Sequence, residues 1–231
     1  MAARFFSHLL DLLFPPRCVF CGGLLRRGED GICARCQTSL PWALEEAGEQ
    51  TREFVSLCVS PLWYRDPVPA SFHRYKFGGR TGYAKVYGRL MAQCVQDHLR
   101  GRYDLITWVP LSDRRRKDRG YDQAFLLAQA AALELGDVAA ETLHKEQDVA
   151  AQSSLEDDAR RRANVLGVYE VPDPELVAGK RILLVDDERE LADMVATILH
   201  GAGFASVDIA NSSAEALSSI AARSASPEHA Y

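Results

Sequence analysis

The chain has 231 residues, 47% hydrophobic and 26% charged, the composition of an ordinary folded protein with one large or two smaller domains. Its net charge of −5 argues against binding nucleic acid or membranes over the whole surface, but it leaves room for a local basic site. No apolar run reaches the ~18 residues of a membrane span, and Ser7, His8 and Asp11 interrupt the N-terminal segment, unlike a signal peptide. We therefore expect a cytoplasmic protein with reduced thiols.

The N-terminal part of the chain combines an apolar segment with four paired cysteines. Residues 1–14 place apolar side chains on one helical face, which predicts a docking helix. Cys18, Cys21, Cys33 and Cys36 follow in the pattern C-x2-C-x11-C-x2-C. Two such pairs complete the tetrahedral coordination of one Zn²⁺, whereas two disulfides are disfavoured among reduced thiols. The pattern predicts a structural zinc knuckle, because four thiolates leave no open position for catalysis.

The rest of the chain alternates strand and helix patterns. Apolar, β-prone runs predict strands over 54–63, 103–109, 181–185 and 206–210. Helical patterns cover 70–76, 83–99, 121–135, 155–163, 212–222 and a segment after residue 187, while 142–154 is predicted to be a loop and 171–179 to be extended. Cys58 and Cys94 stand alone, as small core residues do. This order is typical of an α/β fold with a mainly parallel sheet.

The composition divides this chain into three regions. The stretch 41–51 is acidic and contains glycine, which is typical of a linker. Residues 1–50 are therefore predicted to hold the N-terminal helix, the zinc knuckle and the linker. Residues 51–222 are predicted to form the α/β domain, and residues 223–231 a disordered tail.

The strand predicted over 181–185 ends in two adjacent acids, Asp186 and Asp187. Its apolar run indicates burial on both faces of a parallel sheet. Ligands of open α/β sheets bind beyond the carboxyl ends of such strands, so the acid pair is a candidate site. The alternative is that Asp187 caps the following helix and Asp186 is solvated.

A basic stretch over 111–120 follows the strand at 103–109. Five of its ten residues are basic, namely Arg114, Arg115, Arg116, Lys117 and Arg119. We interpret it as a basic loop, which together with the N-terminus of the next helix would bind phosphate groups. The alternative is a solvated run of charge, partly neutralised by Asp113 and Asp118.

Together these features resemble the ComF family, bacterial competence-associated proteins with a type I phosphoribosyltransferase fold. The resemblance rests on the paired cysteines, followed in order by Tyr75-Lys76-Phe77-Gly78-Gly79-Arg80, Val109-Pro110-Leu111, Arg119-Gly120-Tyr121-Asp122-Gln123-Ala124 and the run from Gly179 to Asp187. It implies a site for phosphoribosyl pyrophosphate (PRPP). There, Asp186 and Asp187 would hold the ribose hydroxyls, and the pyrophosphate would be bound by Arg114, Arg115 and Arg119. Lys76 would be a further residue in contact with PRPP.

The resemblance also implies a role linked to DNA uptake. The expected partners are PRPP or another phosphorylated small molecule, single-stranded DNA, and the competence machinery. The expected metals are structural Zn²⁺ at the cysteines and Mg²⁺ at the acid pair.

The segment after the acid pair departs from the family. After two variable residues the family continues with Thr-Thr-Gly-x-Thr, whereas this chain has no Thr or Gly there and carries the acids Glu188, Glu190 and Asp193. These acids place negative charge where the 5′-phosphate would sit, which predicts a degenerate PRPP site. Two alternatives stay open: an active phosphoribosyltransferase that uses PRPP and Mg²⁺, and a receiver-like Mg²⁺-binding switch, since the run from Val185 to Glu188 also looks like the start of a response-regulator receiver.

Overall fold

The computed structural model describes residues 15–52, 54–146, 168–187, 195–196 and 198–212. The predicted docking helix at 1–14, the helices at 155–163 and 212–222, the acids at 188–193 and the tail at 223–231 lie outside the described residues, apart from Ser212. Within the described ranges, no helix combines the length and apolar character that crossing a membrane requires.

The core of the protein is a five-stranded sheet in the order β1-β2-β7-β6-β3. Its strands are β1 (Gln50–Arg52), β2 (Val55–Val59), β7 (Ser206–Asn211), β6 (Arg181–Asp186) and β3 (Leu105–Trp108). β1 pairs with β2 in antiparallel fashion, and the other three pairings are parallel. The predicted α/β fold with a mainly parallel sheet is confirmed, and β1 begins inside the stretch predicted as a linker.

β6 is buried on both faces, as its apolar run predicts. Leu183 and Val185 belong to the hydrophobic cluster formed with α4 (Tyr83–His98) and α6 (Gln123–Leu135). Ile182 and Leu184 point into a second cluster, which includes residues of the helical segment between 195 and 201. Because successive side chains of a strand alternate between faces, both clusters must exist for every residue of the run to be buried.

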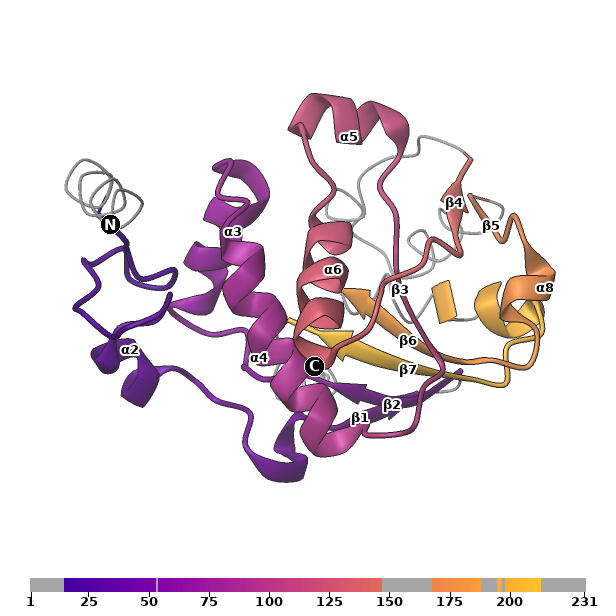
Figure 1. Cartoon of the computed structure of the whole chain (residues 1–231), viewed down its shortest axis with the longest axis horizontal. Helices are drawn as coiled ribbons and strands as arrows, with labels where there is room; N and C mark the ends of the chain where they lie inside the picture. The colour runs from indigo at the N-terminus through magenta and orange to yellow at the C-terminus, as the bar shows by residue number, and fades with distance from the viewer. Residues whose placement is uncertain (1–14, 53, 147–167, 188–194, 197, 213–231) are drawn as a thin grey trace, which may run out of the picture.

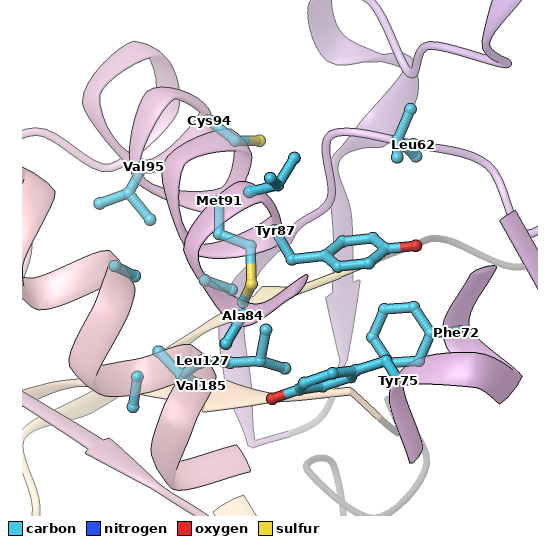
Figure 2. Packing of buried hydrophobic residues seen from close by; sticks show 14 of the residues in the cluster. Leu62, Phe72, Tyr75, Ala84, Tyr87, Met91, Cys94, Val95, Leu127 and Val185 are labelled. Atoms are coloured by element: carbon cyan, nitrogen blue, oxygen red, sulfur yellow. The ribbon is translucent and has the colours of Figure 1, made fainter. Parts of the chain in front are cut away.

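The helices on the first face pack closely around aromatic side chains. The rings of Phe72, from α3 (Val68–Phe77), and Tyr87, from α4, meet edge to face with centroids 4.6 Å apart, and Tyr75 lies beside them (Figure 2). α4 also approaches α6 so closely that a Cβ on Gly88 would lie 2.5 Å from the Cβ of Ala130. This packing fixes α3, α4 and α6 as one layer (Figure 1).

The four-cysteine segment lies against α3 and α4, on the opposite side from the small sheet formed by β4 (His144–Lys145) and β5 (Tyr169–Glu170) (Figure 1). Its short helix α2 (Ala34–Ser39) follows Cys33, and its residues Val19, Phe20 and Ile32 share the cluster of α4 and α6. The segment predicted as a linker contains the 3-10 helix η1 (Glu45–Gly48). The four-cysteine segment therefore packs on the main core and shares its hydrophobic interior.

Two further segments that were predicted without a helix contain an α-helix. The basic stretch interpreted as a loop forms α5 (Asp113–Arg119), and the extended stretch 171–179 contains α8 (Pro174–Val177). α5 begins where Ser112 Oγ accepts a hydrogen bond from the Arg115 N–H and ends at Gly120 in the left-handed conformation. Asp113 in the first turn and the cations in the last turn complement the helix dipole. The loop interpretation was wrong because the run of charge does not prevent a helix here, where Ser112 and Gly120 cap its two ends.

Candidate functional site

The acid pair lies at the carboxyl end of β6, between β7 and the edge strand β3. Asp186 is the last residue of the strand, pairs in register with Asn211 of β7, and is 2% exposed. The side chain of Asp187 is 1% exposed. Two adjacent buried carboxylates need cations or hydrogen-bond donors nearby, because burial without them is costly.

Asp187 forms an ion pair with Lys76, the second-last residue of α3. The contact joins Lys76 Nζ to Asp187 Oδ2, and the lysine side chain is 16% exposed. The structure thus brings together an acid and a lysine that are far apart in the sequence and that the family resemblance assigns to one site.

A pocket of about 390 Å³ opens beside this ion pair. Its walls come from the end of α3, from α5 and from the turn before α6, and are formed by Lys76, Phe77, Gly79, Arg115, Asp118, Arg119 and Tyr121. Three cations face one acid, so the pocket carries a positive balance that suits an anion. Arg114, predicted to act with them, lies outside this set; its side chain is 77% exposed, and its Nε is 3.9 Å from Asp118 Oδ2.

Arg119 is held by several contacts at the pocket. Its guanidinium donates to the side-chain oxygen of Gln123 and lies 5.1 Å from the ring centre of Phe77. The hydroxyl of Tyr121 donates to the carbonyl of Tyr75 on α3. Sequence reasoning gave Phe77 and Tyr121 no role, although both stand in the stretches that carry the family resemblance. They line the pocket only because α3 and α6 are adjacent.

Asp122 is a further acid near the pocket that sequence reasoning did not assign. It caps α6 by accepting from the Phe125 N–H at 3.0 Å, and it also accepts from the Leu111 N–H at 2.9 Å. Burial raises the pKa of Asp122, and the charge of Asp187 adds to the rise, although these hydrogen bonds oppose it. The pKa of Tyr75 is likewise raised by burial and by Asp187. Asp187 therefore lies near a second buried carboxyl group, and the ammonium of Lys76 is in contact with Asp187.

The side chains of the four cysteines lie close together. Their sulfur atoms all lie within 4.8 Å of one another, and the sulfurs of Cys21 and Cys33 are 3.7 Å apart. Burial raises the pKa of Cys21, but donors from Gly23, Arg35 and the neighbouring thiols outweigh it and lower that pKa to about 6. Burial raises the pKa of Cys36. Four converging sulfurs, one of which readily becomes a thiolate, fit a tetrahedral Zn²⁺ ion.

Known proteins resemble this chain both in its four-cysteine segment and over most of its length. Residues 9–48 match the model of a double zinc ribbon domain, which together with the four close sulfurs supports a structural zinc site. A DNA utilization protein of Salmonella typhi, YhgH, is 30% identical over 188 residues, which cover 78% of this chain and 75% of that protein. The chain belongs to the ComF family.

Two further relatives of this ComF chain carry competence names. Competence protein ComFC of Streptococcus pneumoniae is 27% identical over 159 residues, 68% of this chain and 63% of that protein. Competence protein F of Haemophilus influenzae is 29% identical over 133 residues, 49% of this chain and 58% of that protein. The chain therefore spans less than two thirds of the length of these two relatives.

Solved structures give a weaker likeness to this ComF chain. An allosteric regulatory enzyme of purine biosynthesis superposes with a TM-score of 0.41 at 21% identity, over 60% of this chain and 29% of that one. A glutamine PRPP amidotransferase from B. subtilis gives a TM-score of 0.39 at 21% identity, over 59% of this chain and 30% of that one.

Proposed function

We propose that this ComF protein binds a phosphorylated ligand in the pocket of Lys76, Arg115 and Arg119, at a PRPP site that has degenerated. The observation that carries the proposal is the convergence of three cations from α3 and α5 on one pocket, beside the ion pair of Lys76 with Asp187. Guanidinium groups bind phosphate oxygens through paired N–H donors, and an ammonium adds a compact charge. Pyrophosphate is the ligand fragment that suits this arrangement best.

The acid pair supplies the second part of the proposal. Asp186 and Asp187 would hold Mg²⁺ or ribose hydroxyls, since carboxylate oxygens suit a hard cation. A cation bound to Oδ2 of Asp187 would compete with the ammonium of Lys76 for that oxygen. The degenerate character rests on the sequence, which has no Thr or Gly at the positions of the family's phosphate loop and adds negative charge there through Glu188, Glu190 and Asp193.

A calorimetric titration with inorganic pyrophosphate and with PRPP, each with and without Mg²⁺, tests this function. We expect pyrophosphate to bind, and PRPP to bind no more tightly than pyrophosphate, because the 5′-phosphate meets acidic residues instead of N–H donors. Replacing residues 190–193 by Thr-Gly-Ala-Thr removes two acids and should increase PRPP affinity about tenfold or more, through hydrogen bonds of roughly 1.5–3 kcal/mol each to a charged group. Tight Mg²⁺-dependent binding of PRPP by the unchanged protein, lost in Asp187→Asn, would instead favour an active transferase.

A second candidate ligand is single-stranded DNA. The observation that favours it is Phe77, whose side chain is 64% exposed beside the cations of α5. Exposed aromatic rings next to basic residues stack bases while the cations contact the backbone. Binding of an oligonucleotide should then fall steeply with salt.

Paired variants separate the two ligands. Arg115→Ala with Arg119→Ala should abolish pyrophosphate binding, whereas Arg114→Ala with Lys117→Ala, outside the pocket, should weaken only DNA binding. If neither pair changes either affinity, α5 is not the anion site.

A further inference from the structure

We propose that the zinc-binding segment, the four-cysteine stretch from Cys18 to Cys36, controls the anion pocket through helix α3. Zinc and the anion then bind with positive coupling, and Arg74 and Ser71 act as positioning residues. The proposal rests on the proposed function, because it takes the pocket of Lys76, Arg115 and Arg119 as the anion site. It concerns how Lys76, at the end of α3, is held in position relative to the cations of α5.

The first turn of the zinc-binding segment is hydrogen-bonded to α3. Ser71 Oγ donates to the carbonyl of Val19 at 2.7 Å. Arg74 Nη2 donates to the same carbonyl at 3.0 Å and to that of Phe20 at 2.7 Å. Val19 and Phe20 are the two residues between the first pair of cysteines, so metal ligands flank both carbonyls. The geometry of the metal site therefore decides where the Val19 and Phe20 carbonyls lie, and these carbonyls accept the hydrogen bonds from α3.

The same helix carries part of the pocket at its end. Lys76 and Phe77 lie two and three residues after Arg74, within one helical turn, and both line the pocket. The carbonyl of Tyr75 accepts from Tyr121, and the hydroxyl of Tyr75 donates to the carbonyl of Gln123 at 2.8 Å. α3 is thus bound on one side to the zinc-binding segment and on the other to α6 (Figure 1). A shift of α3 changes the distance between Lys76 and the cations of α5.

Loss of zinc removes the restraint on the Val19 and Phe20 carbonyls, because the turn between two thiolates is ordered by the metal. Ser71 is fully buried, and Arg74 is partly buried with its Nη2 on these two carbonyls. Donors that lose their acceptors in a buried place are costly, so α3 must adjust its position to recover partners or water. By reciprocity, an anion that holds Lys76 in place should strengthen zinc binding by the same factor.

The test measures sulfate affinity by NMR titration of the full chain with and without zinc, since sulfate hardly complexes zinc. We expect removal of zinc to weaken sulfate binding about tenfold, within the usual range of coupling between sites. In Arg74→Met, zinc removal should make no further difference. Arg74→Lys keeps the charge and one donor, so it should retain part of the zinc dependence. Ser71→Ala, which retains a small side chain, provides a second variant in case Arg74→Met does not fold.

A matched control comes from the other anchor of the zinc-binding segment. Arg89 of α4 donates to the carboxylate of Asp30 at 2.5 Å and to its carbonyl at 2.7 Å, and neither bond involves α3. Arg89→Met should therefore keep the full zinc dependence of sulfate binding. The pair Arg74 and Arg89 distinguishes transmission through α3 from a general loosening of the segment.

Four outcomes would overturn the proposal. The first is equal sulfate affinity with and without zinc, which leaves the proposed anion site intact. The second is a zinc dependence that Arg74→Met retains in full. The third is loss of hydrogen-exchange protection throughout β6 and β7 after zinc removal, since zinc would then hold the entire fold. No sulfate binding by the zinc-loaded protein would reject the anion site and the coupling together.

Discussion

The four-cysteine segment and the pocket of Lys76, Arg115 and Arg119 are built in opposite ways. The four sulfurs come from one short stretch of chain, and two of them, in Cys18 and Cys36, are buried in the main core. The pocket draws on the end of α3, on α5 and on the turn before α6, and its cations keep access to solvent. The first arrangement provides structure, whereas the second leaves charge available for a ligand.

The comparison shows how charge is tolerated in this fold. At the cysteines, thiolate charge is buried where a metal would balance it. Beside the pocket, the buried charge is that of Asp187, and the ammonium of Lys76 lies against it. Removing a partner should therefore be costly in both places, but for different reasons.

The largest effect is expected from the metal site. Cys36→Ser should reduce bound zinc well below one equivalent per chain and lower the free energy for local opening of the four-cysteine segment by more than about 4 kcal/mol, while β6 and β7 keep their hydrogen-exchange protection. Elemental analysis and hydrogen exchange measure the two effects. Cys94→Ala changes a buried cysteine outside the four-sulfur site. This variant should keep its zinc, and its free energy of unfolding should fall by about 1–2 kcal/mol. Full zinc content in Cys36→Ser would contradict the four-sulfur site.

A smaller effect is expected from the ion pair. Lys76→Met should lower the free energy of unfolding by about 3 kcal/mol, because Asp187 stays buried without its cation. Combining it with Asp187→Asn should recover most of this loss. Lys117→Met, on the exposed side of α5, is the matched control and should stay within ~0.5 kcal/mol of the wild type. If the double variant is no more stable than Lys76→Met, the two side chains are not coupled.

The smallest effect concerns pH and a pair away from both sites. Arg181 donates to Asp104 from its backbone N–H and from its guanidinium, and these bonds lower the pKa of Asp104. A carboxyl group with a lowered folded-state pKa stabilises the protein above its unfolded value, near 3.9, and loses that contribution as the pH falls further. Asp104→Asn should therefore show a smaller loss of stability below about pH 4 than the wild type. Identical acid-denaturation profiles would show that the pair contributes nothing.

Much of the fold could be predicted from local patterns. The apolar run before Asp186 indicated a buried strand, and the structure places it between two parallel neighbours. The periodicity of α4 and α6 gave their positions to within a few residues. α5 was missed because its identity depends on the Ser112 cap and the left-handed Gly120, signals shorter than the run of charge around them.

The sequence by itself determined the elements whose chemistry is local: the paired cysteines, the buried strand with its terminal acids, and the concentration of basic residues after β3. Tertiary structure alone decided that Lys76 meets Asp187 and that Arg115 and Arg119 line the pocket while Arg114 does not. It also decided that the zinc-binding segment holds α3 through Ser71 and Arg74. The physical reason is that spacing along the chain fixes which side chains share a face, whereas contacts between elements depend on how those faces pack.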